Sequence, residues 1–200
     1  RLACTSRRPR CTASRPRRSL NLDSGVASTR YTVDGVTYTR DVLASAPHNV
    51  IVVRIEADKP AAVSCGITLT RPQDAECVSD GPDQLVLTGR LGIRHHETGE
   101  PAGLSFAGRL AARLEGGQLH NEGGAMRIDG AHAVTLVLAA ATSYRGEEPL
   151  AATRATLAAL PGYPELRAAH LEDHRGLFRR VDLALGEGPG PGRPWEDRGR

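Results

Sequence analysis

The sequence predicts a mostly β protein, in which antiparallel sheets pack as a β-sandwich and a short helical linker follows. Between residues 22 and 141, short apolar runs alternate with polar or turn-forming residues, a pattern typical of strands. This stretch contains no helical segments that could connect parallel strands, so antiparallel pairing is expected. After Tyr144 the chain becomes rich in Ala and Leu with helical spacing, which indicates the linker.

Changes in composition divide the chain into four parts. Residues 1–19 are basic and lack apolar periodicity, so we expect them to be disordered. Residues 20–145 form the predicted sandwich domain, and residues 146–186 form the helical linker toward a further domain. Residues 187–200 are rich in Gly and Pro and predict a flexible tail.

The basic start has more than one interpretation. Residues 1–20 hold seven arginines and no acidic residue, as an arm that binds nucleic acid or acidic lipid would. The stretch has no aromatic residue and no recognition fold beside it, so we predict no nucleic acid and no membrane as partner. Another interpretation is that residues 1–19 are not native sequence, for example read-through of a shifted frame. No apolar run approaches the roughly 20 residues of a membrane-spanning helix, and the sequence assigns no compartment.

A β-hairpin is the strongest local prediction. Val26–Val33 and Val36–Leu43 are rich in β-formers and flank an Asp-Gly pair, which favours the positive φ angles of a two-residue turn. Val50–Ala57 is a nearly continuous apolar run, as expected of a strand buried on both faces. Ala61–Thr70 alternates between apolar and small polar residues, which predicts a strand with one wet face.

The second half of the predicted sandwich contains two loops and four further strands. Polar residues predict loops at 71–83 and 92–102. Alternate residues from Leu104 to Leu114 fall on one face of a strand. The other strands are Gln84–Gly89, Ala125–Asp129 and Ala133–Ala141, which gives about nine strands and favours a sandwich.

Two helices are predicted after the strands. Glu148–Ala159 is rich in Ala and Leu, and a Pro-Gly pair ends it. Tyr163–Val181 has apolar residues close to one stripe and forms the second helix. Asp182–Gly186 could add one short strand.

The cysteines and histidines predict no metal site. Cys65 and Cys77 could form a disulfide, but two free thiols, one of them buried, are the preferred interpretation. His170 and His174 lie one helical turn apart and could share a metal, yet no third ligand is evident. Histidines that are partly buried or at the surface of a linker helix are therefore expected.

The loops offer only weak catalytic candidates. His95 and His96 lie beside Glu97 without a visible nucleophile or base partner. Glycosidases pair two carboxyl groups across a sugar, and the polar loop at 71–83 holds Asp74, Glu76, Asp80 and Asp83. Their spacing does not show that any two face one pocket. We therefore predict no catalytic residue and no cofactor.

Six strings, in their order and spacing, resemble the N-terminal domain of glycoside hydrolase family 95. They are NLD at 21–23, YTVDGVTYTR at 31–40, NVIVVR at 49–54, LTRPQD at 69–74, AVTLVLAAATSYRG at 133–146 and HLEDHRGLFRRVDLALG at 170–186. The resemblance covers roughly residues 20–186. It implies the non-catalytic N-terminal β-sandwich of an inverting exo-glycosidase similar to α-L-fucosidases, which remove terminal α-L-fucosyl residues.

The resemblance also implies partners. In that family the catalytic acid and base belong to an (α/α)6 barrel, so this chain alone is expected to be inactive. The barrel is the expected partner, and a fucosylated glycan is the expected substrate of the full-length enzyme. Arg71, Tyr144 and Arg145, polar residues at strand ends, are candidates for a domain interface or for a wall of the sugar site. The family begins with a further strand-rich stretch before Leu22, so the sandwich is expected to be incomplete and to expose an apolar edge.

A stand-alone carbohydrate-binding module is the alternative function. Such modules display exposed aromatic rings on which sugars stack. Aromatic residues make up only 4% of this chain, and Trp195 lies in the Gly/Pro-rich tail. The scarcity of aromatic residues argues against this alternative.

Overall fold

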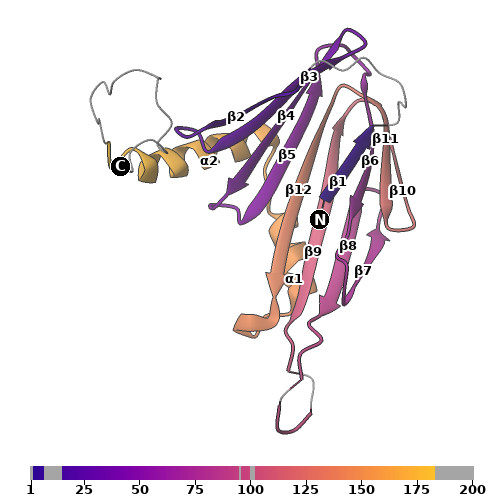
Figure 1. The fold of residues 1–200 in the computed structure, drawn as a ribbon, viewed down its shortest axis with the longest axis vertical. Coiled ribbons are helices and arrows are strands. Elements are labelled where there is room, and N and C mark those ends of the chain that lie inside the picture. Colours follow the sequence, from indigo (N-terminus) through magenta and orange to yellow (C-terminus); the bar gives the residue numbers. More distant parts are fainter. Residues whose placement is uncertain (1, 7–14, 95, 100–101, 183–200) are drawn as a thin grey trace, which may run out of the picture.

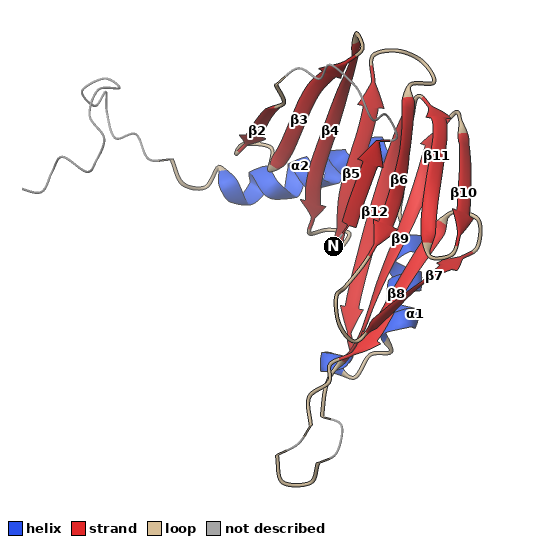
Figure 2. Cartoon of the chain, turned by 45° about the vertical axis from the view of Figure 1, so that its right-hand side comes forward, coloured by secondary structure: helices blue, strands red, loops and turns tan. Residues whose placement is uncertain are grey.

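The computed structural model describes residues 2–6, 15–94, 96–99 and 102–182. Two antiparallel sheets face each other, and two helices lie against the far side of the larger sheet (Figure 1). Figure 2 shows the same layers, with the helices behind the strands. The predicted fold class, antiparallel sheets followed by two helices, is confirmed.

The larger sheet has eight strands in the order β2-β3-β4-β5-β12-β9-β8-β7. The smaller sheet has four, in the order β1-β6-β11-β10. The bounds are β1 Leu2–Ser6, β2 Arg17–Asn21, β3 Val26–Val33, β4 Val36–Ser45, β5 Val50–Ala57, β6 Val63–Leu69, β7 Ala75–Asp80, β8 Gln84–Arg90, β9 Ser105–Glu115, β10 Gln118–Glu122, β11 Ala125–Ala131 and β12 Ala133–Thr142. A short 3-10 helix, η1 (Ser143–Arg145), precedes α1 (Pro149–Ala158) and α2 (Tyr163–Phe178).

Strand β12 lies in the middle of the larger sheet, although it comes last in the sequence. Its Leu136 pairs with Val53 of β5 on one side and with Ala112 of β9 on the other. Both neighbours run antiparallel to it. The last strand therefore joins the half built from β2–β5 to the half built from β7–β9.

Two hydrophobic cores hold the layers together. Between the sheets, Ile67, Leu85, Leu110 and Ile128 are fully buried. A second core between the larger sheet and the helices includes Val52, Val137, Leu157 and Leu166. Burial of each such side chain stabilises the fold by roughly 1.5–3 kcal/mol.

The predicted hairpin forms as expected. Asp34 and Gly35 have φ angles of 51° and 69°, and Val33 pairs with Val36 across the turn. The rings of Tyr31 and Tyr38 stack on adjacent strands with centroids 5.3 Å apart. The alternation predicted for Ala61–Thr70 is likewise found in β6, where Val63, Cys65, Ile67 and Leu69 are buried.

Parts of the predicted disorder and of the predicted loops are strands. Within residues 1–19, for which disorder was expected, β1 pairs with β6 and β2 pairs with β3, while residues 7–14 lie outside the described part. The predicted loop at 71–83 contains β7, which pairs with β8 along its whole length. Both β2 and β7 are edge strands of the larger sheet, which are held mainly by backbone hydrogen bonds. Their side chains are exposed in β2 and half-exposed in β7, so neither strand has an apolar run that could predict it.

The remaining predictions differ in detail. Helix α2 ends at Phe178, three residues before Val181, and the predicted strand at 182–186 lies almost wholly outside the described residues. Cys65 and Cys77 are free thiols, as preferred, and Cys65 is buried in the inter-sheet core. None of the described helices is long and apolar enough to cross a membrane.

Candidate domain interface

The helical segment is fixed to the outer face of the larger sheet by arginines that project from the central strands. Arg113 of β9 donates from Nη1 to the carbonyl of Pro161 at 2.5 Å and from Nη2 to that of Leu160 at 3.3 Å. These carbonyls follow α1, where a helix end leaves backbone acceptors without intrahelical partners. The turn between the two helices is therefore held by a strand side chain.

Arg54 of β5 forms a second link between the sheet and the helices. Its guanidinium lies 4.9 Å from the ring centroid of Tyr163, the first residue of α2. The same group donates to Glu56 at 2.7 Å, to Glu115 at 2.6 Å and to Thr135 at 2.8 Å. Arg54 thus ties three strands of the sheet to the start of α2, and burial raises the pKa of Tyr163 above its usual value.

The far part of α2 is clasped by the turn between β2 and β3. Asp23 accepts hydrogen bonds from Arg179 Nε at 2.6 Å, Arg179 Nη2 at 2.9 Å and Arg175 Nε at 3.0 Å. His170 Nε2 lies 2.9 Å from the carbonyl oxygen of Ser24, and His174 Nε2 lies 2.7 Å from that of Leu22. We call Leu22–Gly25 with these four helix residues the clasp.

The clasp explains the histidine pair that the sequence singled out. The rings of His170 and His174 stack with centroids 5.8 Å apart, and each meets a backbone carbonyl. His170 is buried, and no group of three metal-binding side chains occurs among the described residues. The pair therefore acts in docking the helix, and Gly25 has a φ of +61° with the His174 ring 3.0 Å from the position of an added Cβ.

We predict that Asp23→Ala loosens α2 from the sheet. The change removes the acceptor of both arginines, so amides in the second half of α2 should exchange hydrogen faster while those of α1 keep their protection. Hydrogen–deuterium exchange with mass spectrometry measures this difference. Glu172→Ala, which removes an exposed carboxylate from the same helix, is the matched control and should leave the exchange unchanged.

Low pH should also loosen α2 from the sheet, because it protonates Asp23. The hydrogen bond from Arg179 lowers the pKa of Asp23 below its usual 3.8. A carboxyl group whose pKa is lowered by folding contributes stability above its unfolded pKa and loses it as the pH falls through the folded pKa. In the natural sequence, the hydrogen-exchange protection of α2 should therefore stay constant from pH 7 to pH 5 and should decrease at pH values below 3.8. In Asp23→Ala this decrease should be absent. Equal acid sensitivity of both proteins would contradict this role of Asp23.

The three residues predicted for a domain interface lie near one end of the larger sheet. The guanidinium of Arg71 stacks on Phe106 at 4.3 Å from the ring centroid, and Phe106 pairs with Thr142 at the end of β12. Tyr144 and Arg145 follow directly in η1, which is tied to β9 by the bond from the Ser105 amide to Ser143 Oγ at 3.0 Å. Tyr144 is 78% exposed.

The four acids of the predicted loop have separate contacts in the structure. Asp80 binds the buried Arg109, and Asp74 accepts a hydrogen bond from the Gly92 amide at 3.3 Å. Glu76 lies on β7 opposite Thr88, and the carbonyl of Asp83 accepts from the Ala112 amide at 2.9 Å. In the loop at 92–102, His96 and Glu97 are exposed and 3.5 Å apart, while His95 lies outside the described residues.

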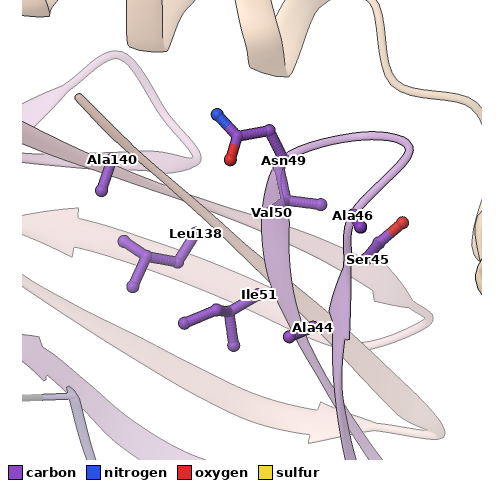
Figure 3. A pocket seen from close by; sticks show the side chains of 8 residues that line it. All are labelled: Ala44, Ser45, Ala46, Asn49, Val50, Ile51, Leu138 and Ala140. Carbon is purple, nitrogen blue, oxygen red and sulfur yellow. The ribbon is translucent and has the colours of Figure 1, made fainter. Parts of the chain in front are cut away.

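A shallow hollow of about 320 Å³ lies on the larger sheet near the turn between β4 and β5 (Figure 3). Its walls are mostly apolar and carry no carboxylate. The lining residues are Ala44, Ser45, Ala46, Asn49, Val50, Ile51, Leu138 and Ala140. Without an acid, a base or a cation in its walls, the hollow offers contact area and no evident chemistry.

Comparison with known proteins identifies the domain. Residues 5–147 match the family described as "Glycosyl hydrolase family 65, N-terminal domain". The chain belongs to this family. The matched range includes much of the basic segment for which a non-native origin was considered, and the resemblance to an N-terminal glycoside hydrolase domain is confirmed at the family level.

Curated relatives of this family 65 N-terminal domain are named as fucosidases. "Alpha-L-fucosidase 2" of Arabidopsis thaliana is 29% identical over 198 residues, and the match covers 84% of this chain and 23% of the relative. "Probable alpha-fucosidase A" of Aspergillus niger is 26% identical over 189 residues, with the same two coverages of 84% and 23%. The chain therefore spans about a quarter of the length of these relatives.

A solved structure shares the fold. The structure titled "Putative kojibiose phosphorylase from human microbiome" superposes with a TM-score of 0.54 at 10% identity. The match covers 84% of this chain and 25% of the other. At this identity the likeness concerns the fold alone.

Sequence reasoning missed the residues that hold the helices to the sheet. Arg54, Arg109 and Arg113 occupy alternate positions of strands that were interpreted from their apolar residues alone. A signal was present, since an arginine at every second or fourth position of a strand marks one face. The partner of α2, Asp23, carried no comparable signal because its contact is 152 residues away.

Proposed function

We propose that this chain is a non-catalytic scaffold domain of a larger glycoside hydrolase that resembles α-L-fucosidases. The observation that carries the proposal is that two fucosidases align with the chain over only 23% of their own length. The remainder of such a protein, for which an (α/α)6 barrel is the expected architecture, would supply the catalytic acid and base. The substrate of the whole protein would be a glycan with terminal α-L-fucosyl residues.

The state of the acidic side chains supports a non-catalytic role. An inverting glycosidase holds its two carboxyl groups roughly 6.5–9.5 Å apart around a sugar and a water molecule. Asp23, Asp80 and Glu115 are instead bound to arginines. The arginine hydrogen bonds lower the pKa of each of these carboxyl groups, which disfavours the protonated form that a general acid needs.

The helical segment suits a scaffold role. Two arginines of the sheet and the clasp hold α1 and α2 against the sandwich, so the direction in which the chain leaves α2 is set by the sheet. A fixed direction would place a following catalytic domain in one orientation. Arg71, Tyr144 and Arg145 are proposed as contacts to that domain or to its sugar site, since they are grouped at one end of the sheet.

We predict that the purified chain does not hydrolyse an aryl α-L-fucoside. Release of 4-nitrophenol from the corresponding fucoside should equal the rate without protein, between pH 4 and pH 8. Full-length "Alpha-L-fucosidase 2" of Arabidopsis thaliana is the positive control. Turnover by the chain that survives repeated purification and disappears in Asp80→Asn would overturn the non-catalytic role.

A stand-alone carbohydrate-binding module is the second candidate, and the exposed ring of Tyr144 is the observation that favours it. Sugars stack on exposed aromatic rings. Tyr31 and Tyr38 stack on each other, and Phe106 lies under Arg71, so one face of each of these rings is already covered. Calorimetric titration with a fucosylated oligosaccharide separates the two functions, because a module binds and loses binding in Tyr144→Ala, whereas a scaffold gives no heat.

A further inference from the structure

Two arginines face each other across the outer strands β2 and β3 of the larger sheet. Arg17 pairs directly with Arg30, and like charges in such a position repel each other. Thr39 of β4 pairs with Arg30 on its other side, so the three residues form one row across three strands. Neighbouring strands lie about 4.8 Å apart, so one anion can reach both guanidinium groups. We call Arg17, Arg30 and Thr39 the basic row.

The basic row lies on the face of the larger sheet that carries the helices. Val26 of β3 packs in the same core as Leu166 of α2, and Arg30 follows Val26 by four residues, which places both on one face. Strand β2 is the outermost strand of this sheet (Figures 1 and 2). Arg17 is its first residue, at the end away from the clasp, and both arginines are exposed. The row is therefore open to a partner from solution.

The acidic residues of this region do not neutralise the row. No ion pair between described residues includes either of its arginines. Hydrogen bonds from Thr37 lower the pKa of Asp58, and Arg30 adds to this effect only through space. Asp41 and Glu56 of the neighbouring strands accept hydrogen bonds from a serine of β3 and an arginine of β5, at 2.6 and 2.7 Å. The repulsion within the row is thus one that an external anion would remove.

The side chains around the row indicate which kind of anion it suits. Nucleic-acid bases stack on aromatic rings, but Tyr31 and Tyr38 of this hairpin lie on the opposite face and stack on each other. A membrane surface requires apolar side chains beside the cations, and Leu20 of β2 also lies on the opposite face. The face of the row carries hydroxyls instead, with Oγ1 of Thr32 and Oγ1 of Thr37 3.2 Å apart. Charge and hydroxyls without rings favour a sugar polymer that carries acidic groups.

We propose that the basic row binds an acidic polysaccharide, one of whose carboxylate or sulfate groups bridges Arg17 and Arg30. The planar guanidinium group binds carboxylate and phosphate through two parallel hydrogen bonds, and sulfate presents its oxygens in the same tetrahedral arrangement as phosphate. The threonine hydroxyls of this face are donors and acceptors for the hydroxyls of the sugar ring. This inference goes beyond the proposed function, because it gives the chain a binding activity of its own toward charged polymers rather than toward a fucosyl residue.

The test measures binding of the full chain to fluorescein-labelled polygalacturonate and dextran sulfate, with neutral dextran as the uncharged probe. Fluorescence anisotropy should show binding to at least one acidic polymer and none to dextran, and the binding should weaken as the salt concentration rises. Tighter binding of polygalacturonate assigns the anion as a carboxylate, and tighter binding of dextran sulfate assigns it as a sulfate.

Substitutions on the two faces of β2 and β3 test the location. Arg17→Gln and Arg30→Gln should each weaken the binding about fivefold. Arg18→Gln is the matched control, because Arg18 is exposed on the same strand but lies on the opposite face, and it should change the binding by less than about twofold. Equal weakening by Arg18→Gln and Arg30→Gln, or no binding of either acidic polymer, would overturn the proposal.

A variant that keeps the charge separates recognition from general attraction. Arg30→Lys retains the positive charge and loses the planar fork, so it should bind nearly as weakly as Arg30→Gln. Binding as tight as that of the natural sequence would contradict the bridging contact. Tighter binding of a double-stranded DNA oligonucleotide, with the same dependence on Arg30, would assign the row to nucleic acid and overturn the proposal as well.

Stability without polymer shows that the variants remain folded. Removal of one charge from a like-charge pair relieves repulsion, so the urea midpoint of Arg17→Gln and of Arg30→Gln should be equal to or higher than that of the natural sequence. A lower midpoint in both variants would assign the two arginines a structural role and contradict the binding role. None of these measurements depends on the fucoside assay, so this proposal and the proposed function fail separately.

Discussion

Gly89→Ala is expected to lower the free energy of unfolding by about 3 kcal/mol or more. A Cβ atom at this position of β8 would lie 1.9 Å from the carbonyl oxygen of Asp74 and 2.4 Å from Cζ of Phe106. A backbone carbonyl cannot turn aside as a flexible side chain can, so β7 must move away from β8. Urea unfolding followed by circular dichroism measures the loss.

The same substitution at two other glycines, one in β9 and one in α2, provides the controls. Gly108 of β9 has only ordinary contacts at 3.9 Å, so Gly108→Ala should change stability far less. Gly176 in α2 has nothing within 4 Å, and Gly176→Ala should stabilise the helix by roughly 0.5–1 kcal/mol. A Gly89→Ala protein as stable as Gly108→Ala would show that the Asp74 carbonyl has room to shift.

Asp80→Ala is expected to destabilise the chain by about 3 kcal/mol, because it leaves a buried guanidinium without its counter-ion. The Arg109 side chain is 2% exposed and binds Asp80 and Gln84. Its Nε already has no hydrogen-bond partner among the described residues. Among the residues that the structure describes, loss of the carboxylate leaves Gln84 as the sole acceptor for this charge.

A second variant separates loss of the pair from loss of packing. Arg109→Met in the Asp80→Ala background removes the buried charge and keeps an unbranched apolar side chain, so stability should return to within about 1 kcal/mol of the natural sequence. Asp83→Ala, three residues from Asp80 and without a described side-chain partner, should be close to neutral. If the double variant were no more stable than Asp80→Ala, unpaired charge would not be the cause.

The parts of the fold that sequence predicts are those that local chemistry determines. The hairpin turn at Asp34-Gly35 needs positive φ at two consecutive residues, and few residue pairs supply it. The apolar alternation of β6 and the helical spacing of α1 reflect faces that each element must bury. Each of these signals lies within a stretch of about ten residues and does not depend on the rest of the chain.

The missed strands are held by partners that are distant or at an edge. The side chains of β2 are all exposed, so no hydrophobic pattern distinguishes it from a disordered basic segment. In β9 only one face was predicted to be buried, yet Arg109 and Ala111 on the other face are buried as well because α1 covers them. The arginines of β9 mark that face, but nothing in the strand's own sequence shows that a helix later in the chain covers it.

At the candidate interface too, local residue patterns were readable from the sequence, whereas contacts with distant backbone groups were not. Sequence reasoning named Arg71, Tyr144 and Arg145 as candidates for a domain interface or a wall of the sugar site, and that role stays a prediction, although all three lie near one end of the larger sheet. It weighed a metal site for His170 and His174 and preferred histidines that are partly buried or at the surface of the helix, and the carbonyls of Ser24 and Leu22 are the contacts of that pair. Those acceptors belong to the backbone, which a side-chain pattern cannot reveal.

The place of β12 constrains how the chain can be made. A ribosome delivers both β5 and β9 before β12, yet in the described sheet those two strands meet only through it. Until residue 142 has left the exit tunnel, each half of the larger sheet has an unpaired edge of apolar residues, and pairing of distant strands is slow. The nascent chain would then be most exposed to aggregation or to chaperone capture in the interval between synthesis of β9 and synthesis of β12.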